Sequence, residues 1–256
     1  CRNSQMKDEI LSVWDILSIF YNTFGFGELN VRLSLHNPAE MDKYLGAEEA
    51  WIQAEEQLRS IAHERGKKAV EAIGEAAFYG PKLDFIAKDS IGREWQVATI
   101  QLDFNMPERF DLVCINEEGV RERIVMIHAA IMGSIERFLS VYIEHCAGVF
   151  PLWLAPVQVA ILPVGEAHHE ASRSLAALLT DHGIRVEVND SNESVGKKIR
   201  NAEKSKVPYM LVIGDKEKDL AALAVRTRGS KDTIEHSTAD FITMIRETIS
   251  RRSLEL

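Results

Sequence analysis

Residues 124–145, IVMIHAAIMGSIERFLSVYIEH, join a short apolar segment directly to an amphipathic one. The apolar run predicts a strand over residues 124–127, and the apolar residues after it recur at helical spacing. His128 stands where the strand gives way to the helix, and Ser134 and Arg137 share a helix face three residues apart. This unit could hold a metal and a nucleotide. The alternative is a core histidine and a solvated arginine on an ordinary helix.

Hydrophobic spacing predicts further helices and strands in the first half of the chain. Apolar residues recur every three or four positions over residues 6–21, which predicts an amphipathic helix. Residues 47–65 predict a second, strongly charged helix. Apolar and polar residues alternate over residues 29–35, which predicts a strand. A longer strand is expected over residues 93–104.

Residues 66–89 predict a strand, a Gly80–Pro81 turn and a second strand, which together would make a hairpin. Tyr79 and Lys82 are polar residues at this turn, and Asp84 follows within the second strand. The turn and the lysine are compatible with ordinary surface chemistry. A Tyr79 hydroxyl offered to a polar substrate is the functional alternative.

Three uncharged polar residues interrupt the apolar strand 93–104. Strict alternation places Thr99 and Gln101 on one face and Gln96 on the other. An unsatisfied buried amide costs roughly 1–3 kcal/mol, so these side chains need partners. A bound ligand would supply such partners, and so would an ordinary side-chain network.

The pattern changes after residues 151–156, where two prolines flank Leu-Trp-Leu-Ala. Beyond this boundary, strands and helices alternate, which predicts a small, mostly parallel sheet with right-handed crossovers. Ser237 and Asp240 have the spacing of a capping box before the last helix. The predicted strands cover residues 157–162, 184–188, 209–213 and 223–226, and the predicted helices cover residues 166–182, 193–204 and 239–251.

Charge is shared unequally between the two halves. Residues 1–151 carry 15 Lys and Arg against 24 Asp and Glu, whereas residues 152–256 carry 15 of each. An acidic chain disfavours non-specific binding of nucleic acid, because neutralisation of phosphates is the main driving force. One segment could still contact RNA, or could form a solvated helix face, since it is locally basic. Its cations are Lys197, Lys198, Arg200, Lys204 and Lys206.

Several classes of protein are disfavoured by simple sequence features. No apolar run reaches membrane-spanning length, and the first residues lack the pattern of a signal peptide. The three cysteines have no paired spacing, which suits a reducing cytoplasm. The chain contains no CxxC, no Walker loop and no GxGxxG.

Five motifs occur in an order that resembles one enzyme family. They are AFYGPKLDF at residues 77–85, WQVATIQLDF at 95–104, MPERFDL at 106–112, VMIHAAIMGSIERF at 125–138 and FPLWLAPVQV at 150–159. They resemble motifs of the class II aminoacyl-tRNA synthetases, in the form used by threonyl-tRNA synthetases. The resemblance covers essentially the whole chain.

The resemblance implies a mixed α/β protein of two domains. Residues 1–150 would be the C-terminal half of an α+β catalytic domain with an antiparallel sheet. Residues 151–256 would be a small, mixed to mostly parallel α/β domain that binds the anticodon. The implied activity is activation of threonine with ATP and Mg²⁺, followed by transfer of threonine to the 3′ end of tRNA(Thr). Homodimerisation in the cytoplasm is also implied.

The resemblance assigns roles to individual residues. His128 would be one ligand of a catalytic Zn²⁺. Gln96, Thr99 and Arg137 would bind ATP. The substrate site would comprise Tyr79, Gln96, Thr99, Gln101, Ser134 and Arg137, and the anticodon would be contacted by Asn192, Arg200, Glu217 and Arg226.

Two departures from the family pattern affect this site. Val97–Ala98 stands where the family often has Cys-Gly, and Ala129 stands where many members have arginine. The first two class II motifs and the other zinc ligands would lie upstream, so we expect this chain to be a C-terminal portion that does not activate threonine alone. A non-catalytic tRNA-binding paralogue and a prolyl or glycyl enzyme are the alternatives.

Overall fold

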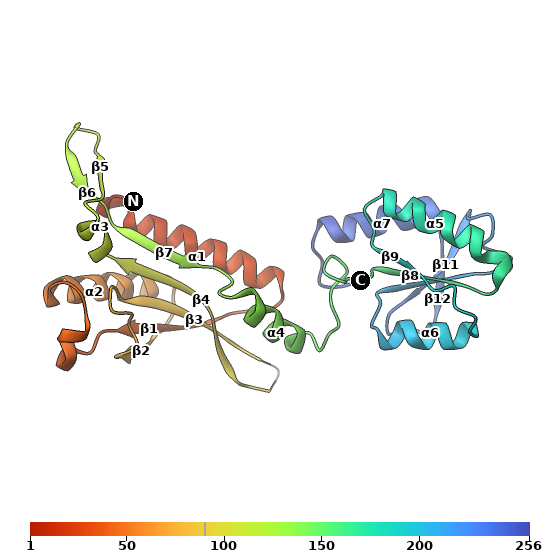
Figure 1. Ribbon diagram of the computed structural model, residues 1–256, viewed down its shortest axis with the longest axis horizontal. Helices are drawn as coiled ribbons and strands as arrows, with labels where there is room; N and C mark the ends of the chain where they lie inside the picture. The colour runs from red at the N-terminus through yellow and green to blue at the C-terminus, as the bar shows by residue number, and fades with distance from the viewer. Residues whose placement is uncertain (90) are drawn as a thin grey trace. The chain divides into compact units, whose positions relative to one another are not determined.

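The computed structural model describes residues 1–89 and 91–256. It divides into two compact units, Cys1–His145 and Cys146–Leu256 (Figure 1). The sequence-based boundary between residues 150 and 151 lies a few positions beyond this division. Within the described residues, every helix is too short or too polar to cross a membrane.

The first unit is built on a five-stranded sheet with the strand order β2-β1-β3-β4-β7. The strands β1, β3, β4 and β7 pair antiparallel, and β2 pairs parallel with β1. The expected antiparallel character of this sheet is therefore confirmed. The strands are β1 (Asn30–Leu35), β2 (Val70–Ile73), β3 (Lys82–Lys88), β4 (Glu94–Asp103) and β7 (Met126–Ala130).

Two long helices, both close to the ranges expected from the sequence, cover one face of this sheet (Figure 1). They are α1 (Met6–Thr23) and α2 (Glu48–Glu64). Alternate residues of β1, namely Val31, Leu33 and Leu35, are buried, and the Trp14 ring of α1 meets the Phe85 ring of β3 edge to face. The sheet face opposite these helices carries polar side chains, among them Asp84, Gln96 and Thr99. The remaining elements are η1 (Asn3–Gln5), η2 (Pro38–Lys43), α3 (Asn105–Arg109), β5 (Val113–Ile115), β6 (Arg121–Arg123) and α4 (Ile135–His145).

Two sequence-based expectations for this unit are wrong. The strands around Gly80–Pro81 do not form a hairpin, because β1 lies between β2 and β3 in the sheet. The strand after residue 123 is β7, Met126–Ala130, rather than residues 124–127, and helix α4 begins only at Ile135. The intervening residues form a turn, in which Gly133 has a φ of 64° that glycine adopts without steric cost.

The second unit contains a five-stranded mixed sheet with the order β12-β11-β10-β8-β9. Strands β10, β8 and β9 are parallel, and β11 and β12 are antiparallel additions. β12 was not predicted, because its residues are mostly exposed and lack a clear apolar alternation. The elements are β8 (Val159–Pro163), η3 (Glu166–His168), α5 (His169–Asp181), β9 (Val186–Val188), α6 (Val195–Lys204), β10 (Tyr209–Ile213), β11 (Ala222–Thr227), β12 (Thr233–Ser237) and α7 (Thr238–Ser250).

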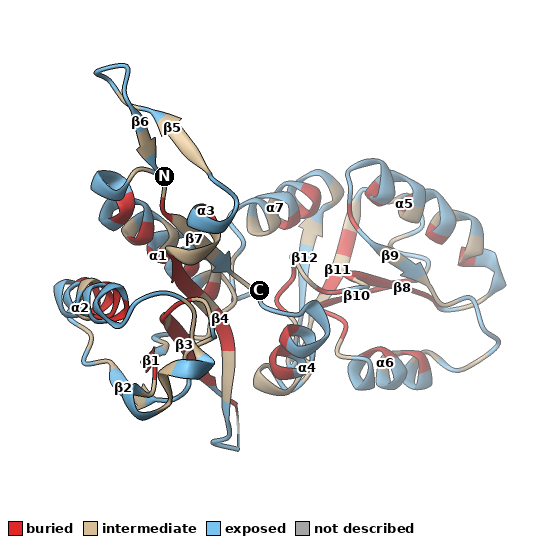
Figure 2. Cartoon of the chain, turned by 60° about the vertical axis from the view of Figure 1, so that its left-hand side comes forward, coloured by how far each residue is buried: buried red, intermediate tan, exposed pale blue. Residues whose placement is uncertain are grey.

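Helices cover both faces of the second sheet, with α5 and α7 on one side and α6 on the other (Figure 1). Leu175 of α5 and Phe241 of α7 belong to the larger core cluster, whereas Ala202 of α6 belongs to a smaller one. The central strands of both sheets are the most buried segments (Figure 2). Each unit therefore has its own hydrophobic core.

Candidate functional site

Asp84 of β3 is the centre of a polar network on the helix-free face of the first sheet. Its side chain is fully buried and accepts hydrogen bonds from both neighbouring strands, β1 and β4. Gln96 Nε2 donates to Oδ1 over 2.7 Å, and Thr99 Oγ1 donates to the same atom over 2.9 Å. Ser34 Oγ of β1 donates to Oδ2 over 2.7 Å. Gln96 and Thr99, which strict alternation would place on opposite faces, are thus held by one carboxylate.

Two cations share this carboxylate. Arg32 of β1 lies 3.3 Å from Asp84 Oδ2 and also donates to Gln96 Oε1 over 3.1 Å. The Lys82 ammonium forms a second ion pair with Oδ2. The cluster therefore contains one more positive than negative charge. Because ordered donors and cations stabilise anions in a partly buried site, this arrangement suits a negatively charged ligand.

A β-bulge places Gln96 on this face. β3 and β4 pair Phe85 with Ala98 and Ile86 with Gln96, so that Val97 is left without an opposite residue. An extra residue in one strand reverses the alternation beyond it. The expectation that Gln96 faces away from Thr99 is therefore wrong, and their side chains lie 2.8 Å apart at Gln96 Nε2 and Thr99 Oγ1.

Gln101 fastens the turn that carries Tyr79. Its Nε2 donates to the Gly80 carbonyl over 3.0 Å, and Asn105 Nδ2 donates to the Tyr79 carbonyl over 3.0 Å. A Cβ at Gly80 would lie 1.9 Å from the Leu102 carbonyl oxygen, so only glycine allows this approach. Tyr79 is half-buried, and the turn holds it beside the end of β4.

His128 of β7 lies beside Tyr79 and Asp103. Its Nε2 is 2.9 Å from the fully buried Asp103 Oδ2, and the Tyr79 ring meets the imidazole edge to face at 5.4 Å. Asp103 Oδ1 also accepts from the backbone N–H groups of Asn105 and Met106, at the start of α3. In residues 1–89 and 91–256, no group of three or more His, Cys, Asp and Glu side chains could hold a metal ion. The residues of this chain alone therefore do not fit a zinc site.

Ser134 and Arg137 do not share a helix face as expected. Ser134 precedes α4, and its Oγ accepts from the Arg137 backbone N–H over 3.2 Å, so the serine caps the helix. The Arg137 side chain is exposed and has no hydrogen bond or ion pair among the described residues. Its guanidinium is available to a ligand.

Sequence reasoning missed two important residues of this site. Asp84 and Asp103 hold Thr99, Gln96 and His128 in place, yet neither was among the predicted site residues. The signal was present, because a carboxylate inside an otherwise apolar strand must have partners. Which residues it would meet depends on strand register.

The four predicted anticodon residues lie on different parts of the second unit. Asn192 and Glu217 are in the loops that follow β9 and β10, at the carboxyl ends of parallel strands. Arg200 is exposed on α6. Arg226 of β11 is opposite Met210, near the amino end of β10, and it pairs with Glu203 of α6. Among the described residues, no hydrogen bond or ion pair joins any two of the four.

The basic segment 197–206 has fewer free cationic side chains than its sequence suggests, because some of them already have partners within the chain. Lys198 is only 2% exposed, and its Nζ donates to the Pro163 carbonyl over 2.9 Å, so its ammonium does not face solvent. Lys197 pairs with Glu193 on the preceding turn. Lys206 donates to a backbone carbonyl. Arg200 and Lys204 remain exposed and have no ion pair in the described part of the chain.

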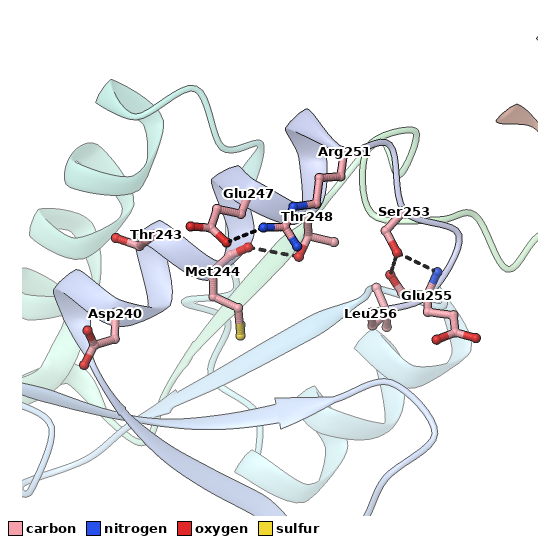
Figure 3. Close-up of a pocket in the computed structure, with 9 residues that line it drawn as sticks. All are labelled: Asp240, Thr243, Met244, Glu247, Thr248, Arg251, Ser253, Glu255 and Leu256. Carbon is pink, nitrogen blue, oxygen red and sulfur yellow. Dashed lines mark hydrogen bonds and ion pairs between the residues drawn. The ribbon is translucent and has the colours of Figure 1, made fainter.

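A hollow of about 480 Å³ lies along α7 beside the last residues (Figure 3). The Glu247–Arg251 ion pair spans part of it, and Ser253 bonds with Glu255 at its other end. None of the predicted anticodon residues lines this hollow. It offers no cluster of convergent polar groups comparable to the Asp84 network.

Both units match known families. Residues 1–146 match the class II tRNA synthetase core domain (G, H, P, S and T), and residues 158–248 match the anticodon-binding domain. The threonine–tRNA ligase of Chlorobium limicola is 44% identical over 253 residues, which cover 99% of this chain and 38% of that protein. The ligase of Chlorobaculum tepidum is 47% identical over 252 residues, with 98% and 38% covered. The chain thus spans 38% of the length of these curated relatives.

A solved structure has the same fold over nearly the whole chain. The crystal structure of the RNA-binding domain of threonyl-tRNA synthetase from Cryptosporidium parvum has a TM-score of 0.90 and 33% identity. The match covers 96% of this chain and 61% of the other.

Proposed function

Because the chain belongs to the class II tRNA synthetases, with a core domain and an anticodon-binding domain, we propose that it forms part of a threonine–tRNA ligase. Relatives at 43–49% identity bear that name. The ligase would activate threonine with ATP and transfer it to the 3′ end of tRNA(Thr). The observation that carries the proposal is the polar face of the first sheet, where Gln96, Thr99, Gln101 and His128 lie around two buried aspartates.

This face would bind the threonyl-adenylate. In adenylate formation the threonine carboxylate attacks the α-phosphorus in line, so the protein mainly positions the reactants and stabilises charge. Gln96 and Thr99 are fixed by Asp84 beside two cations, which supports a role next to the phosphate. Arg137 would pack on ATP, since a guanidinium has both a fixed charge and a planar face. Tyr79, Gln101 and Ser134 would complete the substrate site.

Other features of the whole ligase are part of the same proposal. His128 would supply one ligand of a zinc ion whose remaining ligands come from outside this chain. Magnesium would accompany ATP, and the full-length protein would be a homodimer. A cytoplasmic location is supported by the free thiols of Cys1 and Cys114.

The second unit would read the anticodon through Asn192, Arg200, Glu217 and Arg226. The exposed guanidinium of Arg200 supports this role, because splayed bases are read by such planar donors. Glu217 is held by the Gly214 N–H over 3.0 Å, which orients its loop. Arg226 would have to share its guanidinium between Glu203 and a base.

The test is binding of this chain to a tRNA(Thr) transcript and to the same transcript with a changed anticodon. We expect tighter binding to the cognate anticodon, with roughly a tenfold loss in Arg200→Ala, as for a base-contacting arginine. Arg246→Ala, an exposed arginine on α7, is the matched control and should bind as the wild type does. Equal binding to both transcripts would contradict the proposed anticodon site.

A second measurement tests the catalytic assignment. The full-length ligase that contains this chain should exchange pyrophosphate into ATP only when threonine is present. The 256-residue chain alone should not, as expected from its match to only part of the relatives. Exchange dependent on proline or glycine instead would contradict the threonine specificity.

A further inference from the structure

Tyr21 of α1 lies behind the sheet and reaches through to two backbone segments of the site. Its side chain is 1% exposed. Its hydroxyl is 2.9 Å from the Val97 carbonyl oxygen and 3.0 Å from the Ile131 carbonyl oxygen. The ring is held by edge contacts with Phe20 and Phe26. The single hydroxyl proton therefore lies between two acceptors that are far apart in the sequence.

The Val97 carbonyl has a particular need for this donor. Val97 is the extra residue of the β4 bulge and has no opposite residue in β3. The ladder between β4 and β7 ends at the Thr99–Ala130 pair, so β7 does not extend to Val97. A buried carbonyl without a hydrogen bond is costly. Tyr21 satisfies it and thereby stabilises the bulge that turns Gln96 towards Asp84.

The second acceptor belongs to the turn between β7 and α4. Ile131 is the first residue after β7, and the turn leads to Ser134 and Arg137. A Cβ on Gly133 would lie 3.2 Å from the same Val97 oxygen. The absence of a side chain at Gly133 therefore allows the turn to approach β4 closely. The backbone of this turn and that of β4 thus come together at the Val97 carbonyl.

From these contacts we infer that Tyr21 is a positioning residue for the ATP site. Its hydroxyl sets the distance between the strand that carries Gln96 and Thr99 and the turn that carries Ser134 and Arg137. This inference rests on the proposed function, since ATP is the ligand that both segments would hold. Tyr21 itself touches no substrate, because it lies behind the sheet.

The bridge is independent of pH over the working range. Burial raises the pKa of the Tyr21 phenol well above its ordinary value, so the hydroxyl keeps its proton. No charged group is needed for the two hydrogen bonds. A pH-dependent loss of ATP binding would therefore have another origin.

The test is Tyr21→Phe in the full-length ligase, measured by threonine-dependent ATP–pyrophosphate exchange. Phenylalanine keeps the ring contacts and removes only the bridge. We expect the KM for ATP to rise roughly tenfold while the KM for threonine changes less than about twofold. The matched control is Tyr44→Phe, which removes a hydroxyl bonded to the Asn37 N–H elsewhere in the same unit. This control should leave the KM for ATP unchanged.

A second readout needs no catalysis. Amide hydrogen exchange in residues 131–135 of this chain should be faster in Tyr21→Phe than in the wild type or in Tyr44→Phe. An unchanged KM for ATP, or equal effects of both variants, would overturn the inference, and so would unchanged exchange in the turn. If the wild-type ligase shows no threonine-dependent activity, the proposed function fails, whereas faster exchange in the turn would still establish the bridge.

Discussion

At the scale of single residues, Asp84 and Asp103 show how buried carboxylates organise the polar face. Each accepts several hydrogen bonds and is fully buried. Asp84 holds two predicted site residues and two cations, and Asp103 holds His128 and the start of α3. The site is therefore preorganised by the strands of the sheet before any ligand binds.

Replacing Asp84 by asparagine tests this organisation. We expect Asp84→Asn to lower the free energy of unfolding by about 1–3 kcal/mol, because Arg32 and Lys82 lose their buried anion. The measurement is urea unfolding of the chain. Glu94→Gln, at an exposed ion pair with Lys88, is the control and should change stability by less than about 0.5 kcal/mol. Equal effects would show that Asp84 has no special role.

The stability of the first unit should depend on pH through the carboxylate of Asp89. Burial opposes ionisation, but hydrogen bonds from the Trp95 indole and from Arg93 outweigh it and hold the pKa of Asp89 below its usual range. A carboxyl with a lowered folded-state pKa stabilises the protein above its unfolded pKa of about 4, and this contribution disappears as the pH falls below that value.

Unfolding of wild type and Asp89→Asn in urea at several pH values tests this dependence. The wild type should be more stable at pH 7 and pH 5 by the same amount, and the difference should shrink below about pH 4. A difference that persists undiminished at pH 3 would contradict the assignment.

At the scale of secondary structure, helix caps give a direct comparison within one unit. Ser237 is the N-cap of α7, and its Oγ accepts from the Asp240 N–H over 3.1 Å, which is one of the two hydrogen bonds of the capping box that the sequence predicted. Ser194 begins α6 but makes no such side-chain bond. We expect Ser237→Ala to cost about 1 kcal/mol of stability in α7, and Ser194→Ala to cost only a few tenths in α6. Amide hydrogen exchange in the two helices measures both losses of stability. Equal losses in α6 and α7 would contradict the capping argument.

Periodicity predicted some elements well and others badly. The helices α1 and α2 and the strand β1 have regular apolar spacing and were found close to their predicted positions. The pairing of β2 with β1 could not be foreseen, because register and partner depend on contacts distant in sequence. The bulge at Val97 was missed for a related reason, since a strand pattern assumes unbroken alternation.

The start of α4 was also placed too early. Apolar residues in a turn can mimic helical spacing, and Ile131 did so here. As a result Ser134 was assigned to a helix face, although it is the cap. The identities of Gln96, Thr99 and His128 could be selected from the family resemblance, but their common attachment to two aspartates required the fold.

At the scale of the whole molecule, the two units should unfold separately. Each closes its own core, and the second contains clusters formed entirely within residues 146–256. We expect two transitions in calorimetry, with Asp84→Asn lowering only one midpoint and Ser237→Ala only the other. A single transition shifted by both variants would show that the units unfold as one.

The unequal charge of the two units has a kinetic consequence for a polyanionic partner. Residues 1–145 hold all nine excess negative charges, whereas residues 146–256 are balanced. An approaching nucleic acid is repelled by the first unit over about one Debye length, roughly 8 Å at physiological ionic strength. A nucleic acid that first approaches the second unit is not subject to this repulsion. Diffusion alone would therefore favour arrivals at the second unit, and added salt would erase that preference before it affected the bound state.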